Sequence, residues 1–182
     1  TTLVASSSVI LTFSGSTADI ATTTVSSGAT INLISPNATS TVLEFESGAT
    51  VLVATGTSFY HETLNGWGNG GVLVERGVFE NINDPLTIPA GGTFVADRRT
   101  RTYTDLTVNG TLTHSANTTT QEYYLDLTIP GDLTINAGGS IDVSGAGYDS
   151  GAGTLDGNGP GAGISDGGGG GGGAYGGDGG ES

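Results

Sequence analysis

Short runs of alternating apolar and polar residues, separated by glycine turns, constrain the fold of this chain most strongly. In residues 105–143 an apolar side chain recurs at every second position, and Thr, Asp or Asn stands between. A period of two is typical of strands with one buried and one solvated face. The runs are interrupted at Asn109-Gly110, Pro130-Gly131 and Gly138-Gly139, which are turn sequences. The pattern predicts an all-β chain of short strands and tight turns.

One phrase recurs along the sequence: a glycine, a small residue or none, Thr or Ser, and then two apolar residues separated by one position. Its clear copies contain Gly28, Gly48, Gly92, Gly110 and Gly139, and weaker copies at Gly77 and Gly131 lie inside the longer gaps. The first and third intervals between clear copies are about 20 residues, which predicts a β-solenoid similar to a parallel β-helix, because so short a coil cannot bury its own apolar face. A β-sandwich with donor-strand exchange is the alternative, because the second and fourth intervals are longer and the spacing is imperfect.

The phrase and the composition divide the chain into three segments. Residues 1–25 predict N-terminal strands or a cap, and residues 26–144 hold the repeats. Residues 145–182 contain 19 of the 34 glycines and predict an extended region, whose ordering requires close packing or a neighbouring chain because glycine loses much backbone entropy. Intersubunit contacts are expected here and at the first segment, where Val9, Leu11 and Phe13 alternate and complete their own sheet or that of a neighbour.

The charge balance excludes two classes of partner. The chain has 18 acidic and 4 basic residues, a net charge of −14, and neither Cys nor Lys. Such a charge opposes binding to nucleic acid, whose affinity depends on phosphate neutralisation, and docking on anionic lipid. No apolar run approaches the ~18–20 residues that span a bilayer, so no membrane insertion of this segment is expected. The composition, rich in Thr, Ser, Gly and Asn and free of Lys, resembles that of exported prokaryotic surface proteins and predicts an extracellular location.

Three of the four basic residues are Arg98, Arg99 and Arg101. In so acidic a chain they are natural partners for carboxylates, which arginine binds in a fork. One interpretation is a contact to an acidic neighbouring subunit or to an anionic sugar. The other is local ion pairing at the surface, which stabilises little. Alternation also predicts that Tyr103 lies beside Arg101.

A few acidic and aromatic residues are candidates for a carbohydrate site. Glu44 and Glu46 flank Phe45, and two rises of ~3.3 Å place them roughly 6.5–7 Å apart, near the carboxyl separation of glycosidases. Phe45 is expected in the core, which predicts that both carboxylates lie on the solvated face. Trp67, in a loop of Gly and Asn, and Tyr103 are candidates for stacking on a sugar ring or for covering the edge of a core.

Other motifs concern metals, glycans and catalysis. His61 and Glu62 are adjacent and face opposite ways in a strand, so they predict no metal site. Asn37 and Asn117 fit the N-glycosylation pattern. Four aspartates among the glycines resemble a calcium-binding repeat without its nine-residue period, and no other cofactor is expected. These calcium candidates are Asp149, Asp156, Asp166 and Asp178. No phosphate-binding loop, nucleophile elbow or zinc-peptidase motif is present, so no enzyme is predicted.

Residues 106–112 and 131–145 resemble coils of large prokaryotic surface proteins, the adhesins, autotransporter passengers and filament proteins built as right-handed β-helices. The resemblance covers about residues 26–180 and carries over no catalytic residue. It implies an extracellular structural or adhesive role. We therefore expect a subunit or segment of a surface filament, stalk or adhesin that assembles with copies of itself through strand edges and the Gly-rich region. The alternative is a carbohydrate-binding or polysaccharide-cleaving β-solenoid, with surface glycans as partners, that uses Trp67, Tyr103 and the Glu44/Glu46 pair.

Overall fold

The computed structural model describes residues 2–12, 18–34, 37–81, 85–97, 101–149 and 156–164. These residues form seventeen strands and no helix, so the described part of the chain has no helix that spans a membrane. The chain divides into two compact units. The first, called here the solenoid body, consists of Thr1–His114 and Leu125–Asp142; the second unit consists of Ser115–Tyr124 and Val143–Ser182.

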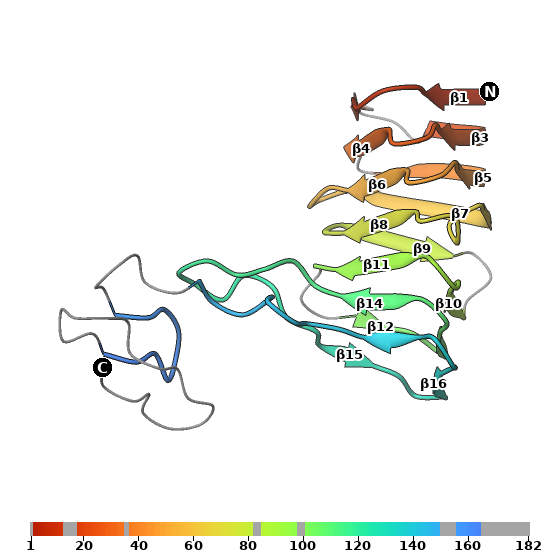
Figure 1. The fold of residues 1–182 in the computed structure, drawn as a ribbon. Coiled ribbons are helices and arrows are strands. Elements are labelled where there is room, and N and C mark those ends of the chain that lie inside the picture. Colours follow the sequence, from red (N-terminus) through yellow and green to blue (C-terminus); the bar gives the residue numbers. More distant parts are fainter. Residues whose placement is uncertain are drawn as a thin grey trace. The chain divides into compact units, whose positions relative to one another are not determined.

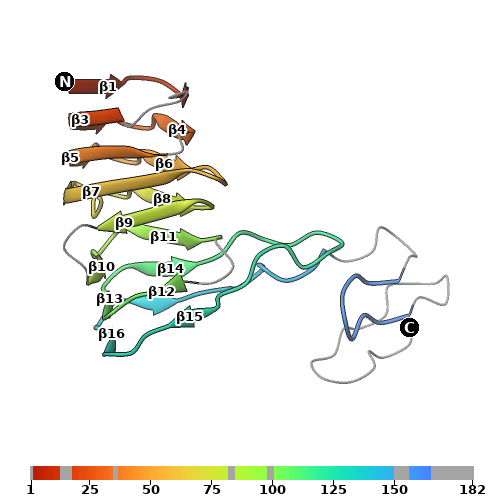
Figure 2. The ribbon, with the colours of Figure 1, turned by 180° about the vertical axis from the view of Figure 1, so that it is seen from behind.

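The strands of the solenoid body stack in four parallel sheets (Figures 1 and 2). The first sheet contains, in order, β1 (Thr2–Ala5), β3 (Ala18–Val25), β5 (Ala38–Phe45), β7 (Ser58–Asn65) and β9 (Val78–Asn81). The second contains β2 (Val9–Thr12), β4 (Thr30–Ile34), β6 (Thr50–Val53), β8 (Val72–Glu75), β11 (Thr93–Ala96), β14 (Thr111–Thr113) and β17 (Ser140–Ile141). The third contains β10 (Leu86–Ile88), β13 (Leu106–Val108) and β16 (Leu133–Ile135), and the fourth β12 (Arg101–Thr102) and β15 (Leu127–Thr128).

Each strand pairs with the equivalent strand of the next coil, which is the defining arrangement of a β-solenoid. Strands β3, β5 and β7 alternate in the sequence with β4, β6 and β8 of the second sheet. Every pairing of the described strands is parallel, whereas a β-sandwich is built from antiparallel sheets. The prediction of a solenoid is confirmed, and the alternative of a sandwich is wrong.

The register of the second sheet explains the irregular spacing of the repeated phrase. Thr50 pairs with Val72, and Val72 pairs with Thr93. The long gap between Gly48 and Gly92 therefore holds a complete coil, in which Val72 follows two glycines in place of Thr or Ser. Gly77, the weaker copy in this gap, precedes β9 of the first sheet and not a strand of the second. In the last gap the strands β14 and β17 pair directly, so this gap is a single coil with an insertion.

Alternation along the strands places every second side chain in a continuous core. In β4 and β6, Ile31, Leu33, Val51 and Val53 are fully buried, while the residues between them are half-buried. The buried side chains of successive strands form inward-facing columns, which continue through β8, β11 and β14. Burial of one such aliphatic side chain contributes about 1.5–3 kcal/mol, so the stacked coils, rather than any single coil, supply the stability.

Glycine turns at the corners keep the coils in register. Gly48 has a φ of 70°, a left-handed conformation that L-residues with a Cβ rarely adopt. Its amide donates to the carbonyl of Asn69 in the next coil at 3.1 Å, and the amide of Gly28 donates to the carbonyl of Ser47 at 3.1 Å. Hydrogen bonding between coils therefore continues through the corners as well as along the strands.

The second unit is ordered in its described residues by hydrogen bonds other than strand ladders. The Oδ1 of Asn117 accepts from the backbone N–H groups of Glu122 and Tyr123, both at 2.7 Å. Its Nδ2 donates to the carbonyls of Tyr123 at 2.9 Å and Ala146 at 3.3 Å. Farther along, the amide of Gly157 donates to the carbonyl of Gly163 at 3.0 Å. One buried asparagine thus joins two segments of this unit that are distant in sequence.

Candidate functional site

A buried carboxylate is the most unusual chemical feature of the solenoid body. Glu75, at the end of β8, is fully buried and accepts from the backbone N–H of Phe79 at 2.9 Å. The hydroxyl of Tyr103 donates to its other oxygen at 3.3 Å. The Arg101 side chain forms an ion pair with it, with Nε 3.4 Å from Oε1. A buried charge persists in a fold only when it is paired and hydrogen-bonded in this manner.

Alternation along β8 explains why Glu75 faces inward. Leu73 and Glu75 have the same parity, and both are fully buried. Burial, followed by the negative charge of Glu75, raises the pKa of Tyr103 far above its usual range, so its hydroxyl remains protonated and donates. The cluster joins β8 to a segment that lies a whole coil farther along the chain. It therefore connects successive coils.

The predicted arginine cluster is only partly described, because Arg98 and Arg99 lie outside the described residues. Arg101 and Tyr103 lie side by side as expected, with the guanidinium carbon 4.8 Å from the ring centroid. The Nη2 of Arg101 also donates to the carbonyl of Phe79 at 2.6 Å. With its side chain 12 % exposed, Arg101 makes the contacts of local ion pairing.

A second ion pair lies nearby. The Nε of Arg76 is 3.1 Å from Oδ2 of Asp97, whose side chain is fully buried. Neither Asp97 nor Glu75 was predicted from the sequence as a site residue. For Glu75 the available signal was a charged residue two positions after Leu73, at an inward-facing position of β8. Asp97 follows β11 and has no such signal.

Trp67 lies in the core and does not present its ring to solvent. It is 3 % exposed, and its Nε1 donates to the carbonyl of Thr93 at 3.2 Å. The indole stacks on Phe45 at 6.3 Å between ring centroids and packs edge-on against Phe94 at 6.1 Å. Phe94 in turn contacts Tyr103, which is also 3 % exposed. Of the two interpretations, covering the core is the one that matches these positions.

An open depression adjoins Trp67. Its volume is about 280 Å³ and it is lined by Leu64, Gly66, Trp67, Gly68, Thr87 and Pro89. None of these residues is acidic. Another open depression, of about 320 Å³, lies over β3 and β5 and contains Asp19. Neither brings together a pair of carboxylates of the kind that glycoside cleavage requires.

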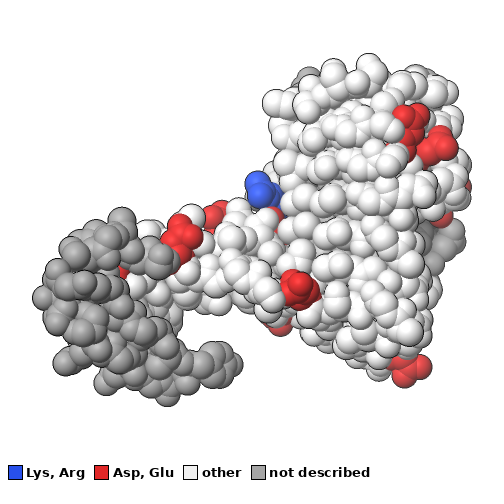
Figure 3. Space-filling model, viewed as in Figure 1, with Lys and Arg blue, Asp and Glu red and all other residues white. Residues whose placement is uncertain are grey.

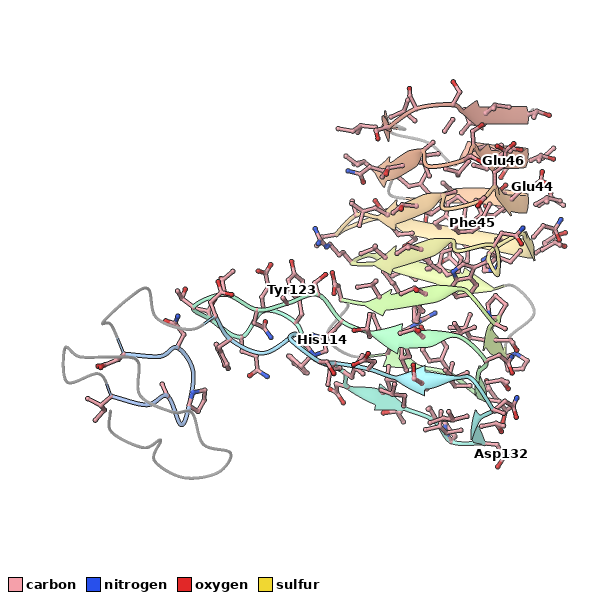
Figure 4. All side chains as sticks on the ribbon, viewed as in Figure 1. Glu44, Phe45, Glu46, His114, Tyr123 and Asp132 are labelled. Atoms are coloured by element: carbon pink, nitrogen blue, oxygen red, sulfur yellow. The ribbon has the colours of Figure 1, made fainter. Side chains whose placement is uncertain are left out.

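Glu44 and Glu46 lie on the outer side of the stack, as predicted (Figure 4). Phe45 between them is 2 % exposed and faces the core. Glu44 belongs to β5 and accepts from the Thr24 hydroxyl at 3.4 Å, whereas Glu46 follows the strand and accepts from the backbone N–H of Ser27 at 2.9 Å. Both carboxylates therefore contact the preceding coil. Elsewhere on the same side of the molecule the acidic residues are scattered among uncharged ones (Figure 3).

The described residues hold no group of three or more His, Asp or Glu side chains arranged to bind a metal ion. His61 is 1 % exposed and stacks on Phe79 at 4.4 Å, while Glu62 is exposed, so the two face opposite ways as expected. Of the calcium candidates, Asp149 and Asp156 are exposed. The other two, Asp166 and Asp178, lie outside the described residues.

The two glycosylation candidates differ in exposure. Asn37 is exposed, immediately before β5. Asn117 is 5 % exposed, and its Nδ2, the atom that a glycan would occupy, donates to two carbonyls. Of these two side chains, Asn37 is the accessible one.

The predicted N-terminal contact strand forms part of the stack. Val9 of β2 is half-buried and packs against the core, and the Leu11 backbone pairs in register with Leu33. Phe13 lies outside the described residues. Strands β1 and β2 each stand at the edge of their sheet, so one side of each has no partner among the described strands.

Comparisons of the chain with protein-family models, with curated proteins and with solved structures found no significant match.

Proposed function

We propose that this chain is an extracellular structural protein, a subunit or segment of a surface filament, stalk or adhesin. The observation that carries the proposal is the continuous parallel stack, in which strands and corners alike are hydrogen-bonded to the next coil. Such a stack extends a chain in one direction, coil upon coil. Its stability arises from neighbour contacts, so length is added without a new core design.

The positions of the chemically distinctive side chains favour this role over a carbohydrate site. Trp67, Tyr103 and Arg101 contribute to packing or internal ion pairing, and Glu44 and Glu46 bond to the preceding coil. A sugar platform needs an exposed aromatic face, which Trp67 and Tyr103 do not offer. A carbohydrate-binding or carbohydrate-cleaving site on this chain would therefore have to use other residues.

Location on the cell surface is tested by labelling intact cells. An antibody raised against the purified chain should bind source cells equally well before and after permeabilisation, and immunogold should mark extended material outside the envelope. Labelling that appears only after permeabilisation would contradict the proposal.

The carbohydrate alternative is tested separately on the purified chain. If the chain has the structural role, the binding signal on a glycan array and the release of reducing ends from polysaccharides should both stay at background. Saturable binding to one polysaccharide, or its cleavage, would favour the alternative.

A further inference from the structure

The last coil of the solenoid body presents core-facing side chains that the described residues do not cover. Leu133 and Ile135 of β16 pair in register with Leu106 and Val108 of β13, which are fully buried. Yet Leu133 and Ile135 are 47 % and 48 % exposed, and Ile141 of β17 is 41 % exposed. Because these side chains belong to inward-facing columns, their exposure marks an open end of the core and not an outer face.

The first coil presents the opposite end of the same columns. In β1, Ala5 pairs with Val25 and Leu3 pairs with Thr23. Val25 and Thr23 are both fully buried and face inward. Leu3, and Val9 in β2, are half-buried and pack against the core from this end. Their strands have an unpaired outer edge among the described strands.

From these two ends we infer that copies of this chain join head to tail, with β16 and β17 of one copy beside β1 and β2 of the next. The inference rests on the proposed structural function and deepens it by naming the partner, a second copy, and the surface. Continuation of the columns pairs Leu133 with Leu3, Ile135 with Ala5, and Ile141 with Val9. The strands of both copies then run parallel, as they do within the stack.

Charge favours a second copy as the occupant. Residues 2–12 contain no charged side chain, in a chain whose net charge is −14. The last coil carries Asp126, Asp132 and Asp142, and Asp132 lies at the open end of the stack (Figure 4). An uncharged first coil adds no like charge to these aspartates. A face that carries exposed carboxylates, such as that with Glu44 and Glu46, would repel them.

The glycine-rich residues 165–182 offer little apolar surface with which to cover this end. Residues 165–182 contain Ala174 and Tyr175 as their only apolar side chains, too few to bury three aliphatic ones. Strands β1 and β2 also lack the charges and prolines by which proteins protect edge strands. A head-to-tail contact between different surfaces that does not close into a ring produces an open filament.

A matched pair of substitutions on β16 tests the docking surface. Leu133→Asp places a charge in the open core end, whereas Thr134→Asp places the same charge on the opposite face of the strand, where Thr134 is also exposed. Sedimentation velocity of the full chain over a range of concentrations should show association that Leu133→Asp weakens at least tenfold and Thr134→Asp leaves nearly unchanged. A wild-type chain that is monomeric throughout, or equal effects of both variants, would overturn the inference.

The register is tested by cross-linking, because the chain contains no cysteine. Adjacent strands lie about 4.7–4.9 Å apart, within the span of about 4.4–6.8 Å that a disulfide bridges between Cα atoms. Leu3→Cys with Leu133→Cys should give a ladder of oxidised oligomers, and Leu3→Cys with Thr134→Cys should not. Association without this selectivity would mean that another face binds. Surface labelling of cells remains a separate readout. If the cells are labelled but the purified chain is monomeric, only the head-to-tail docking is refuted. If the chain forms oligomers but the cell surface is not labelled, only the proposed function is refuted.

Discussion

At the scale of single residues, the solenoid body contains a buried charge that alternation alone would have filled with an aliphatic side chain. Glu75 occupies an inward position, and its negative charge is balanced by Arg101 while Tyr103 and a backbone amide donate to it. The sequence around Glu75 indicated neither its burial nor its partners, because these partners lie a whole coil farther along the chain. Their proximity depends on the coil register, which local sequence does not encode.

The buried tyrosine predicts a loss of stability in alkali. Burial raises the pKa of Tyr103, so above about pH 10 the unfolded chain loses this proton while the folded chain retains it. The folded state then binds more protons, and the free energy of unfolding falls by up to about 1.4 kcal/mol per pH unit. Urea unfolding followed by the fluorescence of the single tryptophan at pH 8 and pH 11 measures this fall.

Two phenylalanine variants isolate the contribution of Tyr103 from that of other groups. Tyr103→Phe should be less stable at pH 8 by about 1 kcal/mol, the value of one hydrogen bond, and should lose less stability at pH 11. Tyr60→Phe, at a half-buried position of β7, should follow the wild-type pH dependence. If both variants follow the wild type, the buried tyrosine does not control the alkaline transition.

At the scale of the coil, much of the fold was predictable because a glycine turn and an alternating apolar run recur in most coils. The copies at Gly28, Gly48, Gly92 and Gly110 each precede a strand of the second sheet. The coil that begins at Val72 was missed because its first strand residue is not Thr or Ser. This position is only half-buried, so it accepts either kind of residue without altering the fold.

Close packing between coils leaves no room for a Cβ at several glycines, of which Gly110 is one. A Cβ on Gly110 would collide with the backbone carbonyl oxygens of Gly92 and Pro89, and backbone cannot move aside as a flexible side chain does. Gly110→Ala should therefore destabilise the body by about 2–3 kcal/mol, as overpacking of cores does. Gly147→Ala, where a Cβ would have no neighbour within 4 Å, should change stability by less than about 0.5 kcal/mol in the same urea titration. Equal effects would show that the contact at Gly110 relaxes readily.

The insertion into the last coil, residues 115–124, is ordered by interactions that its polar sequence does not reveal. Asn117 makes four side-chain hydrogen bonds within the second unit. Asn117→Ala should accelerate amide hydrogen exchange in residues 115–124 and leave the body unchanged, since a lost hydrogen bond costs about 1 kcal/mol locally. Thr118→Ala, at an exposed neighbour, is the control. Faster exchange throughout the body would mean that the two units unfold together.

At the scale of the whole molecule, the excess of negative charge predicts salt stabilisation. A net charge of −14 destabilises the compact state by self-repulsion, which added ions screen. The thermal midpoint should therefore rise as NaCl is increased from 0.05 to 0.5 M, on the order of a few degrees, because about 1 kcal/mol shifts the midpoint of a chain this size by about 2–4 °C. A falling midpoint would indicate that surface ion pairs outweigh the repulsion.

The same measurement tests the calcium hypothesis. CaCl2 and NaCl are compared at equal ionic strength, so that general screening is the same in both. A higher midpoint in CaCl2 would indicate specific binding, and replacing Asp149 and Asp156 by Asn should then remove the difference. Equal midpoints would leave no support for calcium sites that stabilise the fold.

The direction of the inter-coil hydrogen bonds has a mechanical consequence. They run from one coil to the next, along the stack, so tension applied in that direction opens them a coil at a time instead of shearing a whole sheet at once. Each released coil of about 20 residues, at about 3.4 Å per residue, adds roughly 65 Å of contour length. Under load the body would lengthen in steps, as an extensible tether does, before its last coil opened.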